Sequence, residues 1–355
     1  MAAIDALFDQ LLERGGSDLH IAPTYPPMIR QRGELVPLSD EVLSDREAER
    51  LLRELLTEPQ AASFDEHSDL DFVYAYGTKA RFRGNILRKT AGVGGVFRTI
   101  PTKVLTLDQL SVPPGIRKLA DLRAGLVLVT GPTGSGKSTT LAAMIDHINT
   151  TRAGHILTIE DPVEFVHESK RCQVTHREVG DHTPSFVDAI RSAGRENADV
   201  ILVGELRGAE TMKLALQLAS FGVLILATVH TNSAPATIDR FVNAFPAEQQ
   251  PQIRGMLSDA LAGVVSQQLV NTPGGGRIAV HEILIAASGL GTLIREGKTN
   301  QVMSMIQAGQ GEGMQSMDVA LDRLVREGEI SAHDALEKAL DKESFAKLHP
   351  AVQAP

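Results

Sequence analysis

A glycine-rich segment follows a short apolar run near the middle of the chain. The run ends at Val129, and residues 131–140 read GPTGSGKSTT, which matches the pattern G-x-x-x-x-G-K-[ST]. Glycines let such a loop curl so that its backbone N–H groups hold phosphate oxygens at the start of a helix. The lysine adds positive charge, and the hydroxyl after it binds the Mg²⁺ that bridges the phosphates. The sequence therefore predicts a site for ATP and Mg²⁺. A chance glycine turn is the alternative, but it would need neither the strand before the motif nor the helix after it. The residues expected to bind ATP are Gly131, Pro132, Thr133, Gly134, Ser135, Gly136, Lys137, Ser138 and Thr139.

Acidic residues follow two other apolar runs. Residues 159–165 read IEDPVEF, and Glu205 closes the run that begins at Val200. Such carboxylates can orient an attacking water or hold Mg²⁺-bound water, provided that their strands lie near the loop strand. For residues 159–165 the alternative is a solvated turn. We expect Glu164 and Glu205 to act in catalysis, and Ser138 and Glu205 to lie at the metal. Because the usual metal-binding aspartate before Glu205 is replaced by Gly204, we expect Glu205 to act mainly on water.

Histidine and arginine side chains complete the set of candidates. His230 follows the predicted strand 223–228, where it can respond to loss of the γ-phosphate; the alternative is a surface histidine. Arg81, Arg83 and Arg98 lie on predicted strands of the first hundred residues, and alternation places Arg81 and Arg83 on one face. They form either a solvated face or a source of positive charge for the nucleotide of a neighbouring subunit. The second interpretation requires an oligomer.

Length and composition limit the classes of protein to which this chain can belong. The 355 residues suggest two domains, since one domain usually has about 100–200 residues. A net charge of −9 without tryptophan argues against a general nucleic-acid-binding surface. A single cysteine, Cys172, excludes an internal disulfide and a cysteine zinc site. The longest apolar stretch, 221–229, is far shorter than the ~18 residues of a membrane span, and no targeting signal precedes the chain. We expect a cytoplasmic protein.

The order of predicted elements indicates an α/β fold with two domains. The first part contains helices at 3–12 and 44–56 and short strands within 17–38 and at 69–76, 80–87 and 94–100, which suggests a small α+β domain. From Ile116, strands alternate with helices, which is typical of a mostly parallel sheet covered on both faces. Its predicted strands are 126–130, 155–159, 200–203, 223–228 and 278–285. The predicted boundaries are an N-terminal domain at 1–101, a linker at 102–115, an ATPase core at 116–288 and a helical C-terminal segment at 289–355.

Taken together, these segments resemble the secretion ATPases, and among them the type IV pilus retraction ATPases. The resemblance covers nearly the whole chain, because several boxes typical of that family occur in the same order. Besides the phosphate loop and the acidic segments, the matching boxes are 16–20, 26–30, 96–101, 228–233, 237–240, 281–284 and 313–318.

The resemblance implies a PAS-like N-terminal domain and a RecA-like ATPase domain that assemble into a ring of six. It implies that Glu164 and Glu205 handle water and Mg²⁺, and that Arg81, Arg83 and Arg98 reach a nucleotide. It also implies an inner-membrane platform protein as the partner, possibly with paralogous pilus ATPases, and a peripheral position at the inner membrane. Related extension ATPases carry a zinc element with four cysteines, which this chain cannot build. Retraction is therefore favoured over extension.

The chain departs from the family pattern at several positions. Residues 220–223 read SFGV where a carboxylate and a second histidine are usual. Gly194 replaces a leucine, and Gly208 replaces an aspartate. Because glycine in a helix costs about 1 kcal/mol relative to alanine, we expect Gly194 to soften its helix. These departures leave two alternatives open: an accessory paralogue with weak ATP hydrolysis, or a type II or type IV secretion ATPase.

Overall fold

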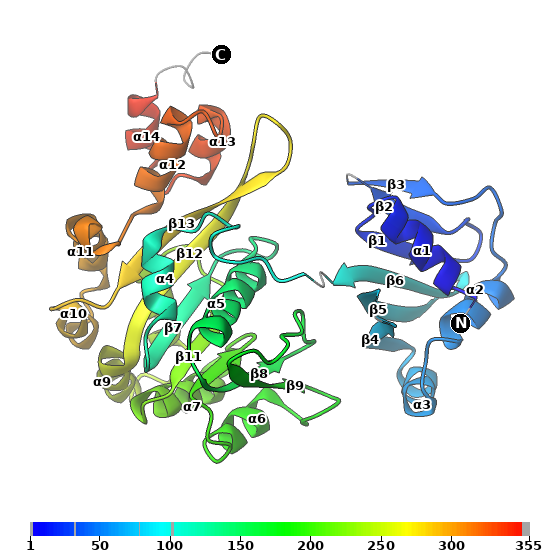
Figure 1. Ribbon diagram of the computed structural model, residues 1–355, viewed down its shortest axis with the longest axis horizontal. Helices are drawn as coiled ribbons and strands as arrows, with labels where there is room; N and C mark the ends of the chain where they lie inside the picture. Colours follow the sequence, from blue (N-terminus) through cyan, green and yellow to red (C-terminus); the bar gives the residue numbers. More distant parts are fainter. Residues whose placement is uncertain (1–2, 32, 78, 101–102, 350–355) are drawn as a thin grey trace. The chain divides into compact units, whose positions relative to one another are not determined.

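The computed structural model describes residues 3–31, 33–77, 79–100 and 103–349, which divide into a unit up to Lys103 and a unit from Val104 (Figure 1). The predicted boundary between Pro101 and Thr102 lies outside the described residues. Most of the predicted linker, residues 104–115, belongs to the second unit, because Leu107 is buried in its core and helix α4 already begins at Pro114.

The described part of the first unit contains a six-stranded antiparallel sheet in the order β3-β2-β1-β6-β5-β4. A reciprocal capping box between Ser44 and Glu47 begins helix α2, as the sequence predicts. Helix α3 was not predicted, because only Phe64 among its residues is buried and no apolar periodicity marks it. The elements are α1 (Asp5–Glu13), β1 (Asp18–Ile21), β2 (Met28–Gln31), β3 (Glu34–Pro37), α2 (Asp45–Arg53), α3 (Glu58–His67), β4 (Asp69–Tyr76), β5 (Ala80–Lys89) and β6 (Gly92–Ile100).

Aromatic side chains hold α1 against one face of this sheet. The ring of Phe8 stacks on Phe82 with centroids 4.2 Å apart and meets the edge of Phe97 at 5.3 Å. All three rings are fully buried. Side chains alternate between the two faces along a strand. The residues between the buried positions of β5, which include Arg81 and Arg83, therefore lie on the opposite face of the sheet.

Within the described residues, the second unit contains a seven-stranded sheet in the order β13-β12-β7-β11-β10-β8-β9. All neighbouring strands run parallel except β12 and β13. This arrangement confirms the predicted α/β fold with a mostly parallel sheet. Its strands are β7 (Gly125–Thr130), β8 (Gly154–Glu160), β9 (Cys172–Glu178), β10 (Val200–Val203), β11 (Leu224–Val229), β12 (Leu261–Asn271) and β13 (Arg277–Ile285).

The sequence analysis missed β9 and β12. Strand β9 lies at the sheet edge and is largely polar and half-buried, so its apolar alternation is weak. Strand β12 begins at Leu261, directly after helix α9 ends at Ala260, without an intervening turn residue. A strand that continues a helix without a break cannot be recognised from turn signals.

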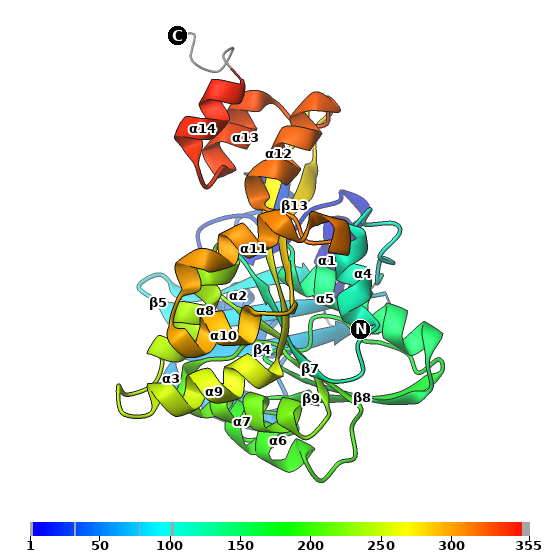
Figure 2. The same ribbon diagram turned by 90° about the vertical axis from the view of Figure 1, so that its left-hand side faces the viewer.

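Helices cover both faces of this sheet. Along β7, Val127 and Val129 face a core that includes α4 and α5, whereas Leu126 and Leu128 face a core built with helices α6 to α11. Helices α12 to α14 form a separate group at the end of the β12–β13 pair, as Figure 1 and Figure 2 show. The helices are α4 (Pro114–Ala120), α5 (Lys137–Thr151), α6 (Phe186–Ala193), α7 (Gly208–Ser220), α8 (Ala234–Asn243), α9 (Gln250–Ala260), α10 (Leu290–Glu296), α11 (Val302–Ala308), α12 (Met317–Arg326), α13 (Ala332–Lys338) and α14 (Lys342–Leu348).

Two of the unusual glycines have structural explanations. Gly194 does not soften a helix interior, because α6 ends at Ala193 and Gly194 is its C-terminal cap. Gly208 begins α7 with a φ of 82°, a conformation that glycine adopts without strain and an aspartate would adopt at a cost. Among the described residues, no helix combines the length and apolar character needed to cross a membrane.

Candidate nucleotide-binding site

The glycine-rich loop joins the interior strand β7 to helix α5. It turns through Gly131, Gly134 and Gly136, which have φ values of 144°, 77° and 86°, and the helix begins at Lys137. Only glycine adopts such φ values readily. The first N–H groups of a helix have no partner within the helix and attract anions. The loop therefore has the backbone shape and polarity of a phosphate site.

Lys137 bends back over this loop. Its Nζ donates to the carbonyl oxygens of Gly131 at 2.9 Å and Pro132 at 3.0 Å. Burial lowers the pKa of the Lys137 ammonium, and the charges of Glu205 and Glu164 oppose that shift. The buried Ser135 hydroxyl has no hydrogen-bond partner. An unpaired hydroxyl and a cation beside a helix start fit the oxygen atoms of a phosphate group.

The strand order places the acidic segment 159–165 farther from the loop than the sequence suggests. We expected this segment to reach the loop if its strand neighboured the loop strand, but β11 and β10 lie between β7 and β8. The position of Glu164 is instead set by the loop that follows β8. Glu164 is exposed, and its negative charge is the weaker of the two that oppose the lowering of the Lys137 pKa.

Glu205 lies between the side chains of Arg207 and His230. Its Oε2 is 2.8 Å from Arg207 Nη2, and its Oε1 is 3.3 Å from His230 Nε2. The carboxyl ends of neighbouring strands β10 and β11 bring these residues together, and Thr228 donates to the Gly204 carbonyl between them. Burial favours the neutral form of Glu205, but Arg207 and His230 together hold its pKa below the usual range. Glu205 is therefore an ionised carboxylate at this edge.

Glu160 is another carboxyl group at this edge of the sheet, and the sequence marks it only as one of the three acids in residues 159–165. Glu160 is the last residue of β8, and its side chain is buried. It lies against Gly204: a Cβ atom added at Gly204 would be 3.4 Å from the Glu160 Cα, which is an ordinary contact distance. Burial raises its pKa to about 7, and one of its oxygens has no partner. Glu160 therefore occupies the space beside Gly204 as a carboxyl group that can hold or release a proton near neutral pH.

Gln267 also contacts the loop and was missed entirely. Its side-chain amide donates to the Ser135 carbonyl at 2.6 Å and accepts from the Thr140 hydroxyl at 2.7 Å. The sequence contains no signal for this role, because β12 was not predicted and only the strand order places Gln267 beside the loop.

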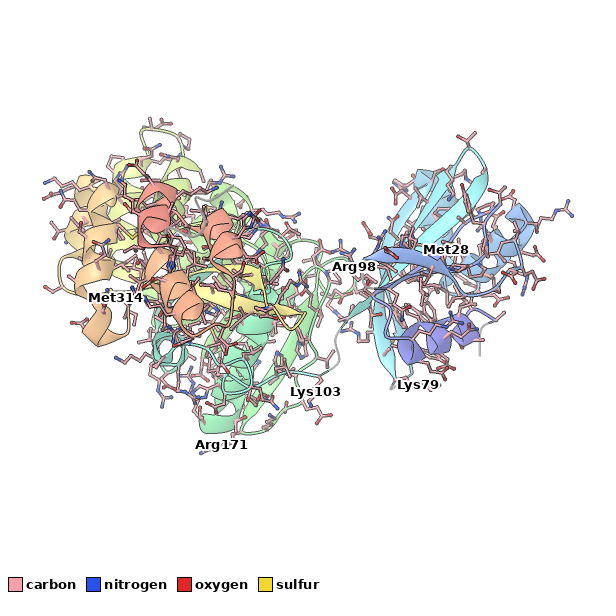
Figure 3. The ribbon with its side chains drawn as sticks, turned by 90° about the horizontal axis from the view of Figure 1, so that it is seen from above. Met28, Lys79, Arg98, Lys103, Arg171 and Met314 are labelled. Atoms are coloured by element: carbon pink, nitrogen blue, oxygen red, sulfur yellow. The ribbon has the colours of Figure 1, made fainter. Side chains whose placement is uncertain are left out.

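The three candidate arginines belong to the first unit, whereas the phosphate loop belongs to the second. Arg83 on β5 lies directly opposite Arg98 on β6 in the strand register, and Arg81 is two positions away. Arg98, labelled in Figure 3, bonds Asp18 Oδ1 through Nε at 2.8 Å, yet its side chain stays 73% exposed. The arginines thus form part of one polar sheet face, which we call the arginine face.

Known proteins resemble this chain along most of its length. A family model for type II/IV secretion system proteins matches residues 76–337. The chain is 48% identical to the type IV pilus retraction ATPase PilT of Pseudomonas aeruginosa, over 94% of this chain and 97% of that protein. It is 46% identical to a twitching motility protein of Neisseria gonorrhoeae, over 90% of this chain and 86% of that protein. A crystal structure of the pilus retraction motor PilT with bound ADP matches 97% of this chain and 99% of that chain, with a TM-score of 0.91 and 39% identity.

Proposed function

Because the chain belongs to the family of type II/IV secretion system proteins, we propose that it is an ATP-hydrolysing motor that drives retraction of type IV pili. The observation that carries this proposal is a nearly full-length similarity to a retraction ATPase, combined with a complete glycine-rich loop that ends at the start of helix α5. The similar structure with bound ADP supports a nucleotide as the ligand.

Each group at the site has a distinct part in ATP hydrolysis under this proposal. The loop N–H groups, Lys137 and Ser135 bind the phosphates. Glu205 and Glu164 orient the attacking water and accept its proton, and His230, next to Glu205, responds to departure of the γ-phosphate.

Mg²⁺, when bound, would neutralise charge on the phosphate oxygens. No three His, Cys, Asp or Glu side chains gather as metal ligands in the described part of the chain. Ser138 and Glu205 would therefore hold Mg²⁺ together with the nucleotide.

The proposal includes assembly into a ring of six at the inner membrane, where the motor acts on a platform protein and has related pilus ATPase paralogues as further partners. In such a ring the arginine face of one subunit completes the nucleotide site of its neighbour. The exposed position of Arg98 supports this part of the proposal, because a guanidinium that is available at a surface can pair with a phosphate.

Mixed rings provide a test for shared sites. Chains with Arg98→Ala and chains with Glu205→Ala are each expected to lose most ATPase activity. An equimolar mixture is expected to regain about a quarter of wild-type activity, because some sites combine an intact Arg98 with an intact Glu205 from the next subunit. ATPase rates of each chain and of the mixture measure this effect. No recovery in rings that native mass spectrometry shows to contain both chains would contradict a shared site.

Deletion of the gene in its own organism tests the proposed function. We expect loss of twitching motility with pili still present on the surface and with protein secretion intact, because pili that assemble but do not retract cannot pull the cell. Reintroducing the wild-type gene restores twitching, and a Lys137→Met gene does not. Lost secretion with normal twitching would contradict pilus retraction and favour a secretion ATPase.

A further inference from the structure

Strand β12 extends past the end of the loop strand and carries Gln267 to the phosphate loop. Strands β12 and β7 run parallel, and Ser266 pairs with Thr130, the last residue of β7. The next residue on each strand is therefore Gln267 on β12 and Gly131 at the start of the loop. Gln267 is only 2% exposed, so its amide must find partners within the protein.

The Gln267 amide bonds both the loop and the helix that follows it. Its Nε2 donates to the Ser135 carbonyl at 2.6 Å, and its Oε1 accepts from the Thr140 hydroxyl at 2.7 Å. In a trans peptide the carbonyl and the following N–H point in opposite directions. Because the Ser135 carbonyl points at the Gln267 amide, the N–H of Gly136 points away from it.

Two loop glycines lie close to Gln267. A Cβ atom on Gly131 would come within 2.2 Å of the Gln267 carbonyl oxygen, and one on Gly136 within 2.9 Å of its Nε2. Both distances are shorter than real contacts. By contrast, a Cβ on Gly134 would meet nothing within 4 Å. Close packing against Gln267 is therefore one reason for glycine at the first and third glycine positions of the loop, in addition to their positive φ values.

His281 on β13 determines which way the Gln267 amide faces. It lies directly opposite Gln267 in the antiparallel register, and its Nε2 is 3.1 Å from Gln267 Oε1. Because the Ser135 carbonyl can only accept, the amide nitrogen must face it and the amide oxygen must face His281. Burial lowers the pKa of His281 to about 4, so the ring is neutral near pH 7 and carries its proton on Nε2.

We propose that Gln267 is a positioning residue for nucleotide binding, which holds the Ser135–Gly136 peptide with its N–H toward the phosphates, and that His281 fixes the orientation of the Gln267 amide. This inference rests on the proposed nucleotide-binding function. Two side-chain hydrogen bonds, His281 to Gln267 and Gln267 to Ser135, then connect β13 to the phosphate loop.

The test compares Gln267→Met with Gln268→Met. Methionine keeps the length of glutamine but has no amide donor. Gln268 is a matched control, because it is the next residue on the same strand and its amide donates to the Lys338 carbonyl at 3.2 Å instead of to the loop. We expect Gln267→Met to weaken binding of a fluorescent ADP analogue about tenfold, and Gln268→Met to stay within about twofold of wild type. Fluorescence anisotropy gives the affinities, and melting temperatures without nucleotide report stability.

The measurements distinguish a role of Gln267 in nucleotide binding from a role in fold stability alone. They also distinguish failure of this inference from failure of the proposed function. A lower melting temperature of Gln267→Met with unchanged ADP affinity would show that Gln267 only stabilises the fold, and would overturn the inference. If Gln267→Met does not fold, His281→Leu tests the same chain of contacts with an expected loss of about threefold in affinity, and an unchanged affinity would overturn it. Absence of binding by the wild-type chain would instead contradict the proposed function itself.

Discussion

Glu205→Gln is expected to lower the rate constant for ATP hydrolysis by about 10²- to 10⁴-fold, the usual contribution of a general acid or base. Glutamine has the same length and can still lie between Arg207 and His230, but it cannot accept a proton from water. Nucleotide affinity is expected to change by less than about threefold, because the phosphates bind mainly to the loop and Lys137. Steady-state phosphate release measures the rate constant, and anisotropy of a fluorescent ADP analogue measures affinity.

Glu343→Gln is the matched control for this change. Glu343 is exposed on α14, and its carboxylate pairs with Lys347 Nζ at 2.7 Å on the same helix. We expect its replacement to leave hydrolysis unchanged, since exposed ion pairs of this kind contribute little. A Glu205→Gln protein that hydrolyses ATP at the wild-type rate would show that Glu205 is not the catalytic carboxylate.

Lys137→Met is expected to weaken ADP binding by about 10- to 100-fold, because a hydrogen bond to a charged group is worth about 1.5–3 kcal/mol. The same substitution is expected to leave the melting temperature without nucleotide unchanged or higher. Lys137 is a buried ammonium whose pKa is lowered by desolvation, so an apolar side chain of similar length removes a buried charge from the nucleotide-free loop. Anisotropy and thermal melting of the same samples measure the two effects.

Weaker ADP binding without a lower melting temperature would make the result specific to phosphate binding. A misfolded variant would lose both affinity and thermal stability, whereas we expect loss of affinity alone. Lys347→Met on α14 removes an exposed lysine and should change neither quantity. ADP affinity within about threefold of wild type would contradict the assignment of Lys137 to the phosphates.

The helices and strands with strong local patterns could be predicted from the sequence. The capping box at Ser44 and the apolar run before Gly131 are complete within a few residues, and the structure contains α2 and β7 at those places. Elements without local signals were missed. Strand β12 follows α9 without a turn, and the only apolar residue that α3 buries is Phe64.

The sequence by itself determined the chemistry of the phosphate loop, since its glycines, Lys137 and Ser138 lie within eight consecutive residues whose spacing fixes the loop shape. Tertiary structure decided which other residues meet this loop. Glu205 contacts Arg207 and His230 because β10 and β11 are neighbours, whereas β8, which ends in Glu160, is separated from β7 by these two strands. Gln267 reaches the loop because β12 lies beside β7 and continues past its end, and His281 reaches Gln267 because β13 pairs with β12. The pairing of β7 with β12 joins residues more than a hundred positions apart, such as Leu126 and Leu261, and no short sequence pattern records such a contact.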